Sequence, residues 1–416
     1  MKAIFRVGTL AGIVGATLAL TAVPAAAQDG VITNARIIVG NGQVIENGTI
    51  VVRGGKIESV AAGKASNTRG LQVLDAKGMT AMPGFIDGHK HVTSNPNEKG
   101  HMLSALEAGY TTILAGGNPP GGSILLRDKI EKGEFIGPRI IPSERVNLRS
   151  TPDEARAAIR EMAAKGVKHT GEIALTPEPA PPQAEIEVIK AIVDEGAKVG
   201  VQINVHSVST PATIAALDAG VRRFVHLPNK DWMGFDDAAK IAAAGGNIAG
   251  LNAFGAPIID RESPAPALVQ FPKDNTPRFR DGKAWPEAIA GANRDPKGRA
   301  TGTEAGYTMV NARRIWDASN NALSWSTDQS YDDLVVLEHE LKSYSVMFSQ
   351  ADIFKIMGPN SAAYVGMADK IGTLEAGKLA DIILIDGDPR LNIYEMLKTK
   401  VVFKEGKLLV DKRKKK

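Results

Sequence analysis

Cysteine is absent from the 416-residue sequence. Its absence excludes disulfide cross-links, a thiol nucleophile and a cysteine-ligated metal site. A chain of this length can bury a hydrophobic core large enough to fold without disulfides. Hydrophobic residues make up 43% and charged residues 23% of the sequence, so the composition predicts a globular protein.

Long apolar runs are missing except at the N-terminus, where one short run follows Lys2 and Arg6. Ala25 and Ala27 end this stretch with the small-x-small pattern of a signal-peptidase site. We therefore predict a signal peptide at residues 1–27, cleaved near Ala27, and a periplasmic or secreted mature protein. The alternative is an uncleaved anchor. Because the run is short and interrupted by glycine and threonine, no stable membrane insertion is expected.

A strong excess of one charge is also absent from the body of the chain. The sequence pI is about 9.0, but Lys2, Arg6 and the five basic residues of the tail 412–416 raise it. Without them, 43 basic residues stand against 46 acidic ones. A slightly acidic body disfavours nucleic-acid binding, and we expect the basic tail to be solvated.

The two ends of the predicted mature chain share a pattern of short β-rich runs. Residues 28–80 hold such runs between turn-forming stretches rich in glycine and asparagine, and residues 367–411 hold two more. We predict that the two segments together form one small β-sandwich domain.

The middle of the chain, residues 81–366, alternates β-type runs with amphipathic helical segments. Eight repeats of strand and helix predict an α/β fold, a (β/α)8 TIM barrel. The seventh unit carries a long insertion, roughly Asp260 to Ala300, which at the top of a barrel would form a lid. The eight β-type runs span residues 81–91, 110–117, 139–148, 166–175, 199–208, 223–229, 247–255 and 321–329.

Histidines and an aspartate recur where the predicted strands end. His89 and His91 close the first run, and in a strand residues i and i+2 point to the same face. His206, His226 and Asp328 end the fifth, sixth and eighth runs. Because the carboxyl ends of barrel strands meet at one rim, we expect these side chains to surround a metal site. Any one of these histidines alone could be structural; the set indicates metal binding.

The fourth run, GVKHTGEIAL, offers three polar candidates close together. Glu172 lies at its carboxyl end and can reach the rim. Lys168 shares the face of Glu172 but lies about 13 Å deeper, at about 3.3 Å per residue. His169 points to the opposite face, where we expect it to pack against the helices. We therefore add Glu172 to the metal ligands; its alternative role is a salt bridge at the strand end.

Three segments of the sequence resemble the metal-dependent amidohydrolase superfamily. The stretch MPGFIDGHKH is similar to the first-strand signature of that superfamily, and STDQS, at the eighth strand, and residues 360–389 resemble it as well. The resemblance covers nearly the whole predicted mature chain. It implies a barrel enzyme in which a metal-activated hydroxide attacks a carbonyl or imine carbon.

The fourth strand departs from the commonest pattern of that superfamily. Many members carry a carboxylated lysine there, whereas this sequence has Glu172, which is similar to the glutamate of imidazolonepropionase-like and enamidase-like members. Neutral imidazoles and carboxylates suit Zn²⁺, with Fe²⁺ or Mn²⁺ as alternatives, and a glutamate can bridge two ions or bind one alone. We assign to a first metal His89, His91 and Asp328 and to a second His206 and His226, with Glu172 between the two.

The resulting hypothesis is an exported metal-dependent hydrolase of C–N bonds other than peptide bonds. Its small-molecule substrate would be a cyclic or linear amide, an N-acyl amino acid or a dipeptide-like molecule. Asp328 would accept the proton of the attacking water and return it to the leaving nitrogen. Two alternatives stay open: a deaminase or a lactone or organophosphate ester hydrolase on the same site, and a non-catalytic metal-binding barrel. The sequence leaves homo-oligomer formation open.

Substrate contacts are predicted on the loops and strand ends around the rim. An arginine in such a place could hold a substrate carboxylate. Each candidate could equally be an ordinary loop residue. The candidates are Asn118, Arg145, Asn147, Asn229 and Trp232.

Overall fold

The structure is a computed structural model of the chain. The residues it describes are 29–65, 68–117, 120–252, 269–270, 278–279, 301–328 and 333–413. The predicted signal peptide and Asn118 lie outside these residues, and so does the predicted insertion apart from β15 (Val269–Gln270) and β16 (Arg278–Phe279). Export and a lid therefore stay predictions. Within the described ranges, every helix is too short or too polar to cross a lipid bilayer.

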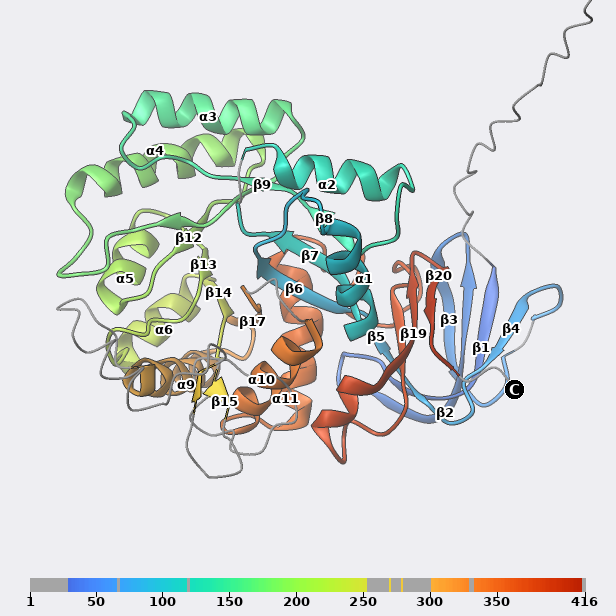
Figure 1. Ribbon diagram of the computed structural model, residues 1–416. Coiled ribbons are helices and arrows are strands. Elements are labelled where there is room, and N and C mark those ends of the chain that lie inside the picture. Colours follow the sequence, from blue (N-terminus) through green and yellow to red (C-terminus); the bar gives the residue numbers. More distant parts are fainter. Residues whose placement is uncertain are drawn as a thin grey trace, which may run out of the picture.

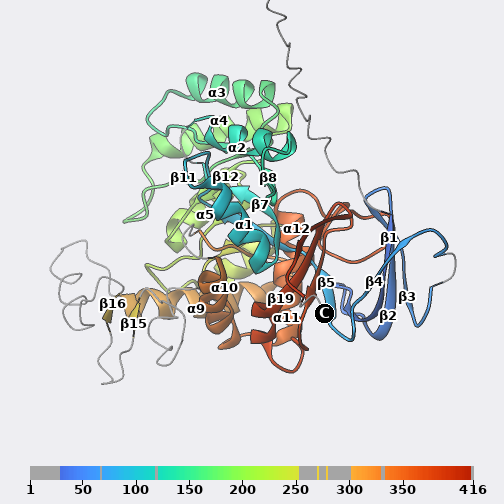
Figure 2. The same cartoon turned by 45° about the vertical axis from the view of Figure 1, so that its right-hand side comes forward.

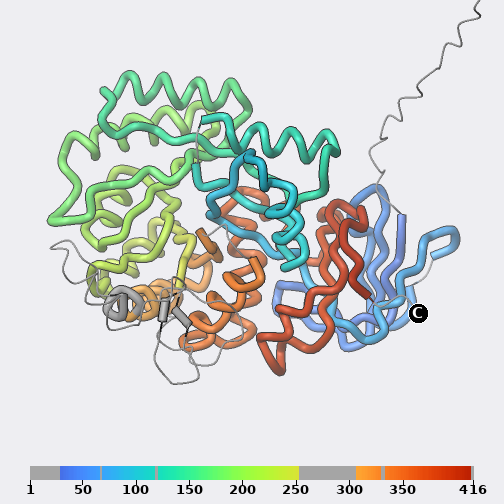
Figure 3. The backbone as a smooth tube through the Cα atoms, viewed as in Figure 1, coloured from blue at the N-terminus to red at the C-terminus, as the bar shows by residue number. Residues whose placement is uncertain are grey.

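Both ends of the described chain meet in one eight-stranded sheet, blue and red in Figure 1. Its strands follow the order β20-β19-β18-β5-β1-β2-β3, with β4 also on β1. Figure 3 shows the two ends side by side. The sheet stays continuous because β1 pairs with β4 along its first half and with β5 further on. The two ends therefore meet as predicted, but in a single sheet rather than a sandwich. The strands are β1 (Gly30–Ile38), β2 (Val44–Arg53), β3 (Lys56–Ala62), β4 (Gln72–Asp75), β5 (Thr80–Pro83), β18 (Ile382–Ile385), β19 (Thr399–Lys404) and β20 (Lys407–Asp411).

Gly84 separates this sheet from the parallel strands. The sequence predicts one strand over 81–91, but β5 belongs to the terminal sheet and a new strand, β6 (Phe85–Lys90), follows. The N–H of Gly84 donates to the carbonyl of Asp381 at 3.0 Å. A Cβ added at Gly84 would lie 2.2 Å from the Thr111 hydroxyl oxygen. The chain can cross between the two sheets here because glycine has no side chain to collide with Thr111.

Short parallel strands follow one another in the order predicted for a barrel, but they do not pair as one closed sheet. They form three sheets, β6-β7-β8, β9-β10 and β11-β12-β13-β14-β17. The third and fourth predicted strands are each broken in two. Pro142, which has no N–H to donate, lies at the first break. At the second break the N–H of Gly171 donates to the carbonyl of Glu144, in β9. The N–H of Glu172 donates to the carbonyl of Gly116, just after β7. The strands after β6 are β7 (Tyr110–Ala115), β8 (Arg139–Ile141), β9 (Ser143–Glu144), β10 (His169–Thr170), β11 (Ile173–Ala174), β12 (Asn204–His206), β13 (Arg223–Val225), β14 (Asn247–Gly250) and β17 (Leu323–Trp325).

Helices surround these parallel strands, as Figures 1 and 2 show. α3 (Pro152–Ala164) begins after Thr151, which exchanges side-chain and backbone hydrogen bonds with Glu154 in a capping box. α1 (Glu98–Ala108) ends at Gly109, whose φ of 105° favours glycine. The remaining helical segments are α2 (Gly122–Glu131), α4 (Gln183–Val199), α5 (Thr210–Asp218), α6 (Phe235–Ala243), α9 (Thr301–Ala318), α10 (Asp333–Ser345), α11 (Gln350–Lys355), a π-helical turn (Ile356–Asn360), α12 (Ser361–Tyr364) and a 3₁₀ helix (Ile393–Lys398).

The short helix α12 packs among the parallel strands. Tyr364 shares a buried cluster with Ile86, Leu114 and Ala249, which come from three different strands. Its hydroxyl donates to the carbonyl of Phe224 in β13 at 3.1 Å. These contacts fix the relative positions of strands whose carboxyl ends carry the predicted ligands.

Candidate metal centre

His89 and His91 lie together at the carboxyl end of β6. Their rings meet edge to face, with centroids 5.1 Å apart. Both cover Gly116: a Cβ there would lie 2.8 Å from Cε1 of His89 and 3.1 Å from Cε1 of His91. Lys90, between them, instead reaches Asp333 in α10. The two imidazoles therefore share the side of β6 that faces Gly116.

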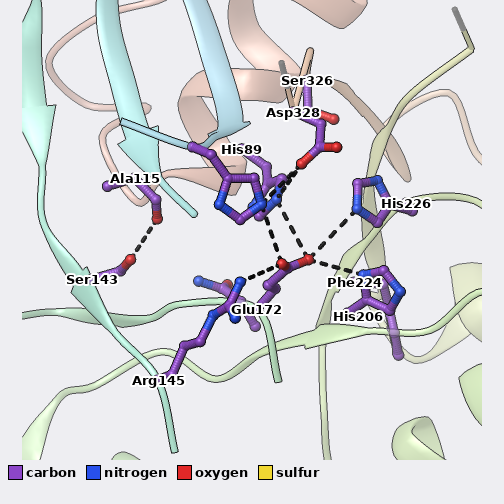
Figure 4. Close-up of polar contacts among 12 residues, drawn as sticks. His89, Ala115, Ser143, Arg145, Glu172, His206, Phe224, His226, Ser326 and Asp328 are labelled. Atoms are coloured by element: carbon purple, nitrogen blue, oxygen red, sulfur yellow. Dashed lines mark hydrogen bonds and ion pairs between the residues drawn. The ribbon is translucent and has the colours of Figure 1, made fainter. Parts of the chain in front are cut away.

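Glu172 is the centre of a ring of four histidines, at the break between β10 and β11. Nδ1 of His206 lies 2.9 Å from its Oε2, and Nε2 of His91 lies 3.2 Å from its Oε1. The Nε2 atoms of His89 and His226 are each 3.6 Å from Oε2. Figure 4 shows these contacts converging on the carboxylate. One side chain from the fourth strand thus touches ligand candidates from the first, fifth and sixth.

In Figure 4 Asp328 lies above and Glu172 below His89, so the two carboxylates flank its Nε2 atom. Oδ1 of Asp328 lies 3.2 Å from Nε2 of His89 and 3.1 Å from Nε2 of His91. Asp328 has a φ of 60° and His226 a φ of 66°, a conformation that costs a non-glycine residue about 1–3 kcal/mol. Two backbone hydrogen bonds hold Asp328 there: its N–H donates to His89 at 2.8 Å, and its carbonyl accepts from His91 at 3.2 Å.

The six predicted ligands form three overlapping groups of three donors. Within each group the candidate ligand atoms lie within 4.8 Å of one another. Imidazole nitrogens and carboxylate oxygens are the donors that Zn²⁺, Fe²⁺ and Mn²⁺ accept. Of the two ring nitrogens of His226, Nε2 faces Glu172 at 3.6 Å and is the one that can bind a metal in the cluster. The groups are His89, His91 and Glu172; His89, His226 and Asp328; and Glu172, His206 and His226.

Burial controls the protonation of these side chains. It lowers the pKa of His89 and of His206, so that neutral rings with a free lone pair are favoured. Burial also opposes ionisation of Glu172 and Asp328. Hydrogen bonds from the surrounding imidazoles outweigh this effect and hold the pKa of both carboxyls well below its usual range. The carboxylates of Glu172 and Asp328 therefore face the imidazoles of His89 and His206, a combination suited to binding a divalent cation.

The sequence match to a known family agrees with this geometry. A sequence model of the amidohydrolase family matches residues 80–409. That span holds all six predicted ligands. This chain belongs to the amidohydrolase family. The predicted resemblance is thereby confirmed, while the imidazolonepropionase-like or enamidase-like subtype stays a prediction.

Curated relatives of this amidohydrolase match it over a limited segment. The N-acyl-D-aspartate deacylase of Alcaligenes xylosoxydans xylosoxydans is 37% identical over 91 residues, which are 22% of this chain and 18% of that protein. An adenine deaminase of Clostridium botulinum (strain Langeland) is 41% identical over 89 residues, 21% of this chain and 14% of the deaminase. The matched segment is thus less than a fifth of the length of either relative.

A solved structure is similar over nearly the whole amidohydrolase. The structure of a Xaa-Pro dipeptidase with bound methionine in the active site has a TM-score of 0.71 at 19% identity, covering 92% of this chain and 100% of that chain. At this identity the similarity shows the fold alone. The amidohydrolase therefore has an α/β fold of the TIM-barrel superfamily, although its strands form three sheets instead of one closed barrel.

The predicted substrate contacts differ in where the structure places them. Arg145 joins the cluster: its guanidinium donates to Oε1 of Glu172 at 2.6 Å, and about half of its side chain is exposed. Asn147 is exposed and accepts the N–H of Arg149 in a local turn. Within the described residues, Asn147, Asn229 and Trp232 make no hydrogen bond or ion pair with the six candidate ligands. Asn229 is buried, and Trp232 is half exposed beside Tyr307.

The other polar residues of the opening stretch lie away from the cluster. Lys168 is exposed and precedes β10. His169 is buried with Nε2 3.2 Å from the carbonyl of Val365, next to α12. Burial, together with the charge of Arg223, lowers the pKa of His169 to about 3. His169 is therefore a neutral structural side chain.

Two buried charges beside the ligands, Asp87 and Lys90, have no role in the sequence prediction. Asp87 accepts the N–H of His89 and two hydrogen bonds from Thr327, the residue before Asp328. The sequence offered one indication that Asp87 lies near the ligands: it precedes His89 by two residues, and alternation places such residues on one side of a strand. Thr327 and Asp333, which contact the ammonium of Lys90, could not be found this way because they lie more than two hundred residues away.

Gly171 is required for the close approach of two site loops. A Cβ at this position would lie 2.4 Å from Cα of Gly117, a backbone atom that cannot move aside independently. We expect Gly171→Ala to destabilise the amidohydrolase by about 1–3 kcal/mol, as overpacking does. Urea unfolding measures this change.

Gly100 in α1 offers the matched control for Gly171. A Cβ there meets no atom within 4 Å. Gly100→Ala should therefore raise the free energy of unfolding by about 0.4–1 kcal/mol through the usual helix effect. If both substitutions change the free energy of unfolding by the same small amount, the steric explanation for Gly171 is wrong.

Proposed function

We propose that this amidohydrolase is an exported metal-dependent hydrolase of C–N bonds, acting on a cyclic or linear amide. The observation that carries the proposal is the position of Glu172, whose single carboxylate contacts four imidazoles. A carboxylate in that place can serve two adjacent metal sites. The deacylase, deaminase and dipeptidase named among the similar proteins support a reaction at a bond between carbon and nitrogen.

The proposed metal is Zn²⁺, as one or two ions, with Fe²⁺ or Mn²⁺ as alternatives. When bound, it would polarise the substrate carbonyl and lower the pKa of water from 15.7 to about 7. His89 belongs to two of the three donor groups, so the same side chains can hold either one ion or two. The proposed first set is His89, His91 and Asp328, the second is His206 and His226, and Glu172 lies between them.

Asp328 is the proposed general base and general acid. It contacts both His89 and His91, and its backbone is held by hydrogen bonds on both sides. A carboxylate so placed can take a proton from the attacking water and return it to the leaving nitrogen. Protonating the nitrogen matters because an amine anion is a poor leaving group.

Arg145 points to the substrate class. It is the cation nearest to Glu172 among the described contacts, and half of its side chain is open to solvent. A guanidinium can bind a carboxylate through two parallel hydrogen bonds. We therefore propose that the amide substrate carries a carboxylate, as N-acyl amino acids and dipeptide-like molecules do.

The test of the proposed function is a substrate panel on the Zn²⁺-loaded protein. The panel spans N-acyl amino acids, dipeptides, cyclic amides, aminopurines, lactones and organophosphates. We expect hydrolysis of at least one amide class, lost on chelation and restored by Zn²⁺. Turnover confined to aminopurines or to esters would replace the proposal by the corresponding alternative. Stoichiometric Zn²⁺ without turnover of any compound would favour a non-catalytic barrel.

Replacing Arg145 by glutamine tests the substrate class. We expect kcat/KM to fall about 10–100-fold for carboxylate-bearing amides, the size of a lost charge-assisted hydrogen-bond pair. Neutral amides should be affected much less. Steady-state kinetics on matched pairs of acids and their methyl esters measures the difference.

Arg149 provides the control because it is exposed and close in sequence but makes no contact with Glu172. Arg149→Gln should leave kcat/KM within about twofold for both kinds of amide, as surface substitutions usually do. If Arg145→Gln lowers kcat/KM equally for charged and neutral amides, Arg145 does not select the carboxylate.

A further inference from the structure

Lys90 is a buried cation placed between two candidate metal ligands. Only 2% of its surface is exposed. Its ammonium lies 3.0 Å from Oδ1 of Asp333, in the first turn of α10, and donates to the Thr327 hydroxyl at 3.1 Å. It also lies 5.9 Å from the ring centre of Tyr110. Lys90 therefore ties β6 to the residue before Asp328 and to α10 at once.

Stability alone does not explain a lysine at this position. Asp333 is also buried, with 3% of its surface exposed. Removing two charges from water costs as much as their attraction returns, so apolar replacements of a buried ion pair are often as stable or more so. An ion pair at this position therefore indicates a geometric role.

The position that Lys90 helps to fix is that of Asp328. Its left-handed backbone, with φ of 60°, persists only if neighbouring contacts enforce it. His89 and His91 hold its own N–H and carbonyl, while Thr327 is held by Lys90 and by Asp87. Every one of these contacts runs from the Thr327–Asp328 segment to β6 or to His91, the residue directly after it.

We propose that Lys90 is a positioning residue of the metal centre. Together with Asp87 it fixes Thr327 on β6, and so holds the Asp328 carboxylate at a set distance from His89 and His91. Lys90 itself touches neither substrate nor metal. The inference rests on the proposed function for the role of Asp328, but its geometric part concerns only where that carboxylate lies.

The test removes both charges of the pair together. Lys90→Met combined with Asp333→Leu removes both charges of the ion pair, and Asp87 keeps its hydrogen bonds from His89 and Thr327, so the double variant should unfold at a denaturant midpoint closer to that of the unaltered protein than Lys90→Met does. Lys90→Met alone should unfold much more readily. If Lys90 positions Asp328, the folded double variant should still lose kcat by about 10–100-fold with little change in KM, the size typical of residues that orient ligands.

A spectroscopic readout separates this inference from the proposed function. The visible absorption bands of Co²⁺ bound in place of Zn²⁺ depend on the arrangement of its ligands. We expect these bands to shift in the double variant even if no substrate is ever found. A loss of kcat together with shifted bands would confirm the catalytic consequence. Shifted bands with an unchanged kcat would keep the geometric role of Lys90 but contradict the proposed proton-transfer role of Asp328.

The matched control is a second lysine–carboxylate pair away from the cluster. Lys129 lies 2.6 Å from Glu98 and 2.9 Å from the Ser94 hydroxyl, the same kind of arrangement between α1 and α2. Lys129→Met combined with Glu98→Leu should leave the Co²⁺ bands unchanged and kcat within about twofold.

Thr327→Val keeps the Lys90–Asp333 pair and removes only the hydroxyl link. It covers the case in which the double variant does not fold. We expect the same shift of the Co²⁺ bands, with Thr327→Ser retaining the original spectrum. A folded double variant or a folded Thr327→Val variant with unaltered Co²⁺ bands and kcat would overturn the inference.

Discussion

Replacing Asp328 by asparagine is expected to lower kcat by about 10²–10⁴-fold, the usual contribution of a general acid–base group. Asparagine has the same size and keeps an oxygen for metal binding, but it cannot accept a proton at neutral pH. KM should change far less than kcat because the substitution removes a proton-transfer step. Steady-state kinetics on the best amide substrate measures the effect, and metal analysis of the same sample shows whether the ions remain.

Asp317 supplies the control for this substitution. It is an exposed carboxylate in α9 whose ion-pair partner among the described residues is Arg313, one helical turn away. Asp317→Asn should leave kcat within about twofold. A metal-loaded Asp328→Asn variant with the kcat of the unaltered protein would remove Asp328 from the proposed mechanism.

The Glu172→Gln variant is expected to lose metal affinity by more than about 100-fold. Replacing a residue that only hydrogen-bonds to a metal ligand already costs about 10–100-fold in affinity. Glutamine keeps the shape of the side chain but removes its charge. All four surrounding histidines then lose their common anionic partner. Competition with a chromophoric chelator measures the affinity, and turnover should fall with the bound metal.

Glu144 is a suitable comparison because it also ends a parallel strand and also has a cationic partner. Its carboxylate lies 3.2 Å from Lys165 and outside the three donor groups. Glu144→Gln should keep the metal affinity of the unaltered protein. If Glu172→Gln binds Zn²⁺ as tightly as Glu144→Gln does, Glu172 is not a ligand.

The meeting of the six candidate ligands could be predicted because it depends on two simple regularities. Parallel strands in sequence order bring their carboxyl ends to one edge, and alternation puts His89 and His91 on one side of β6. Both rules need only strand positions within a residue or two. His206 at the end of β12, His226 directly after β13 and Asp328 shortly after β17 satisfy them.

The interruptions of the fold could not be predicted from the same patterns. One β-type run at residues 81–91 became β5 and β6 in different sheets, because Gly84 lets the chain cross beside Thr111. The fourth run broke at Gly171, where backbone donors turn to other strands. Hydrophobic patterning identifies a run as a strand but does not say which strand pairs with it, since pairing is decided by distant residues.

Long-range side-chain contacts were also beyond sequence reasoning. Arg145 was predicted near the rim, but its ion pair with Glu172 depends on how two broken strands approach each other. The pair of Lys90 and Asp333 joins residues from opposite ends of the barrel sequence. Alternation correctly turned Lys90 away from the ligands but could not show what it would meet on the other side.

The most direct measurement of the central claim is anomalous X-ray diffraction from crystals of the Zn²⁺-loaded protein, collected on both sides of the zinc absorption edge. The account predicts one or two anomalous peaks beside Glu172, each at about 2.0–2.2 Å from imidazole nitrogens and carboxylate oxygens of the six side chains. Crystals of the loaded protein with no peak among these six residues would contradict it.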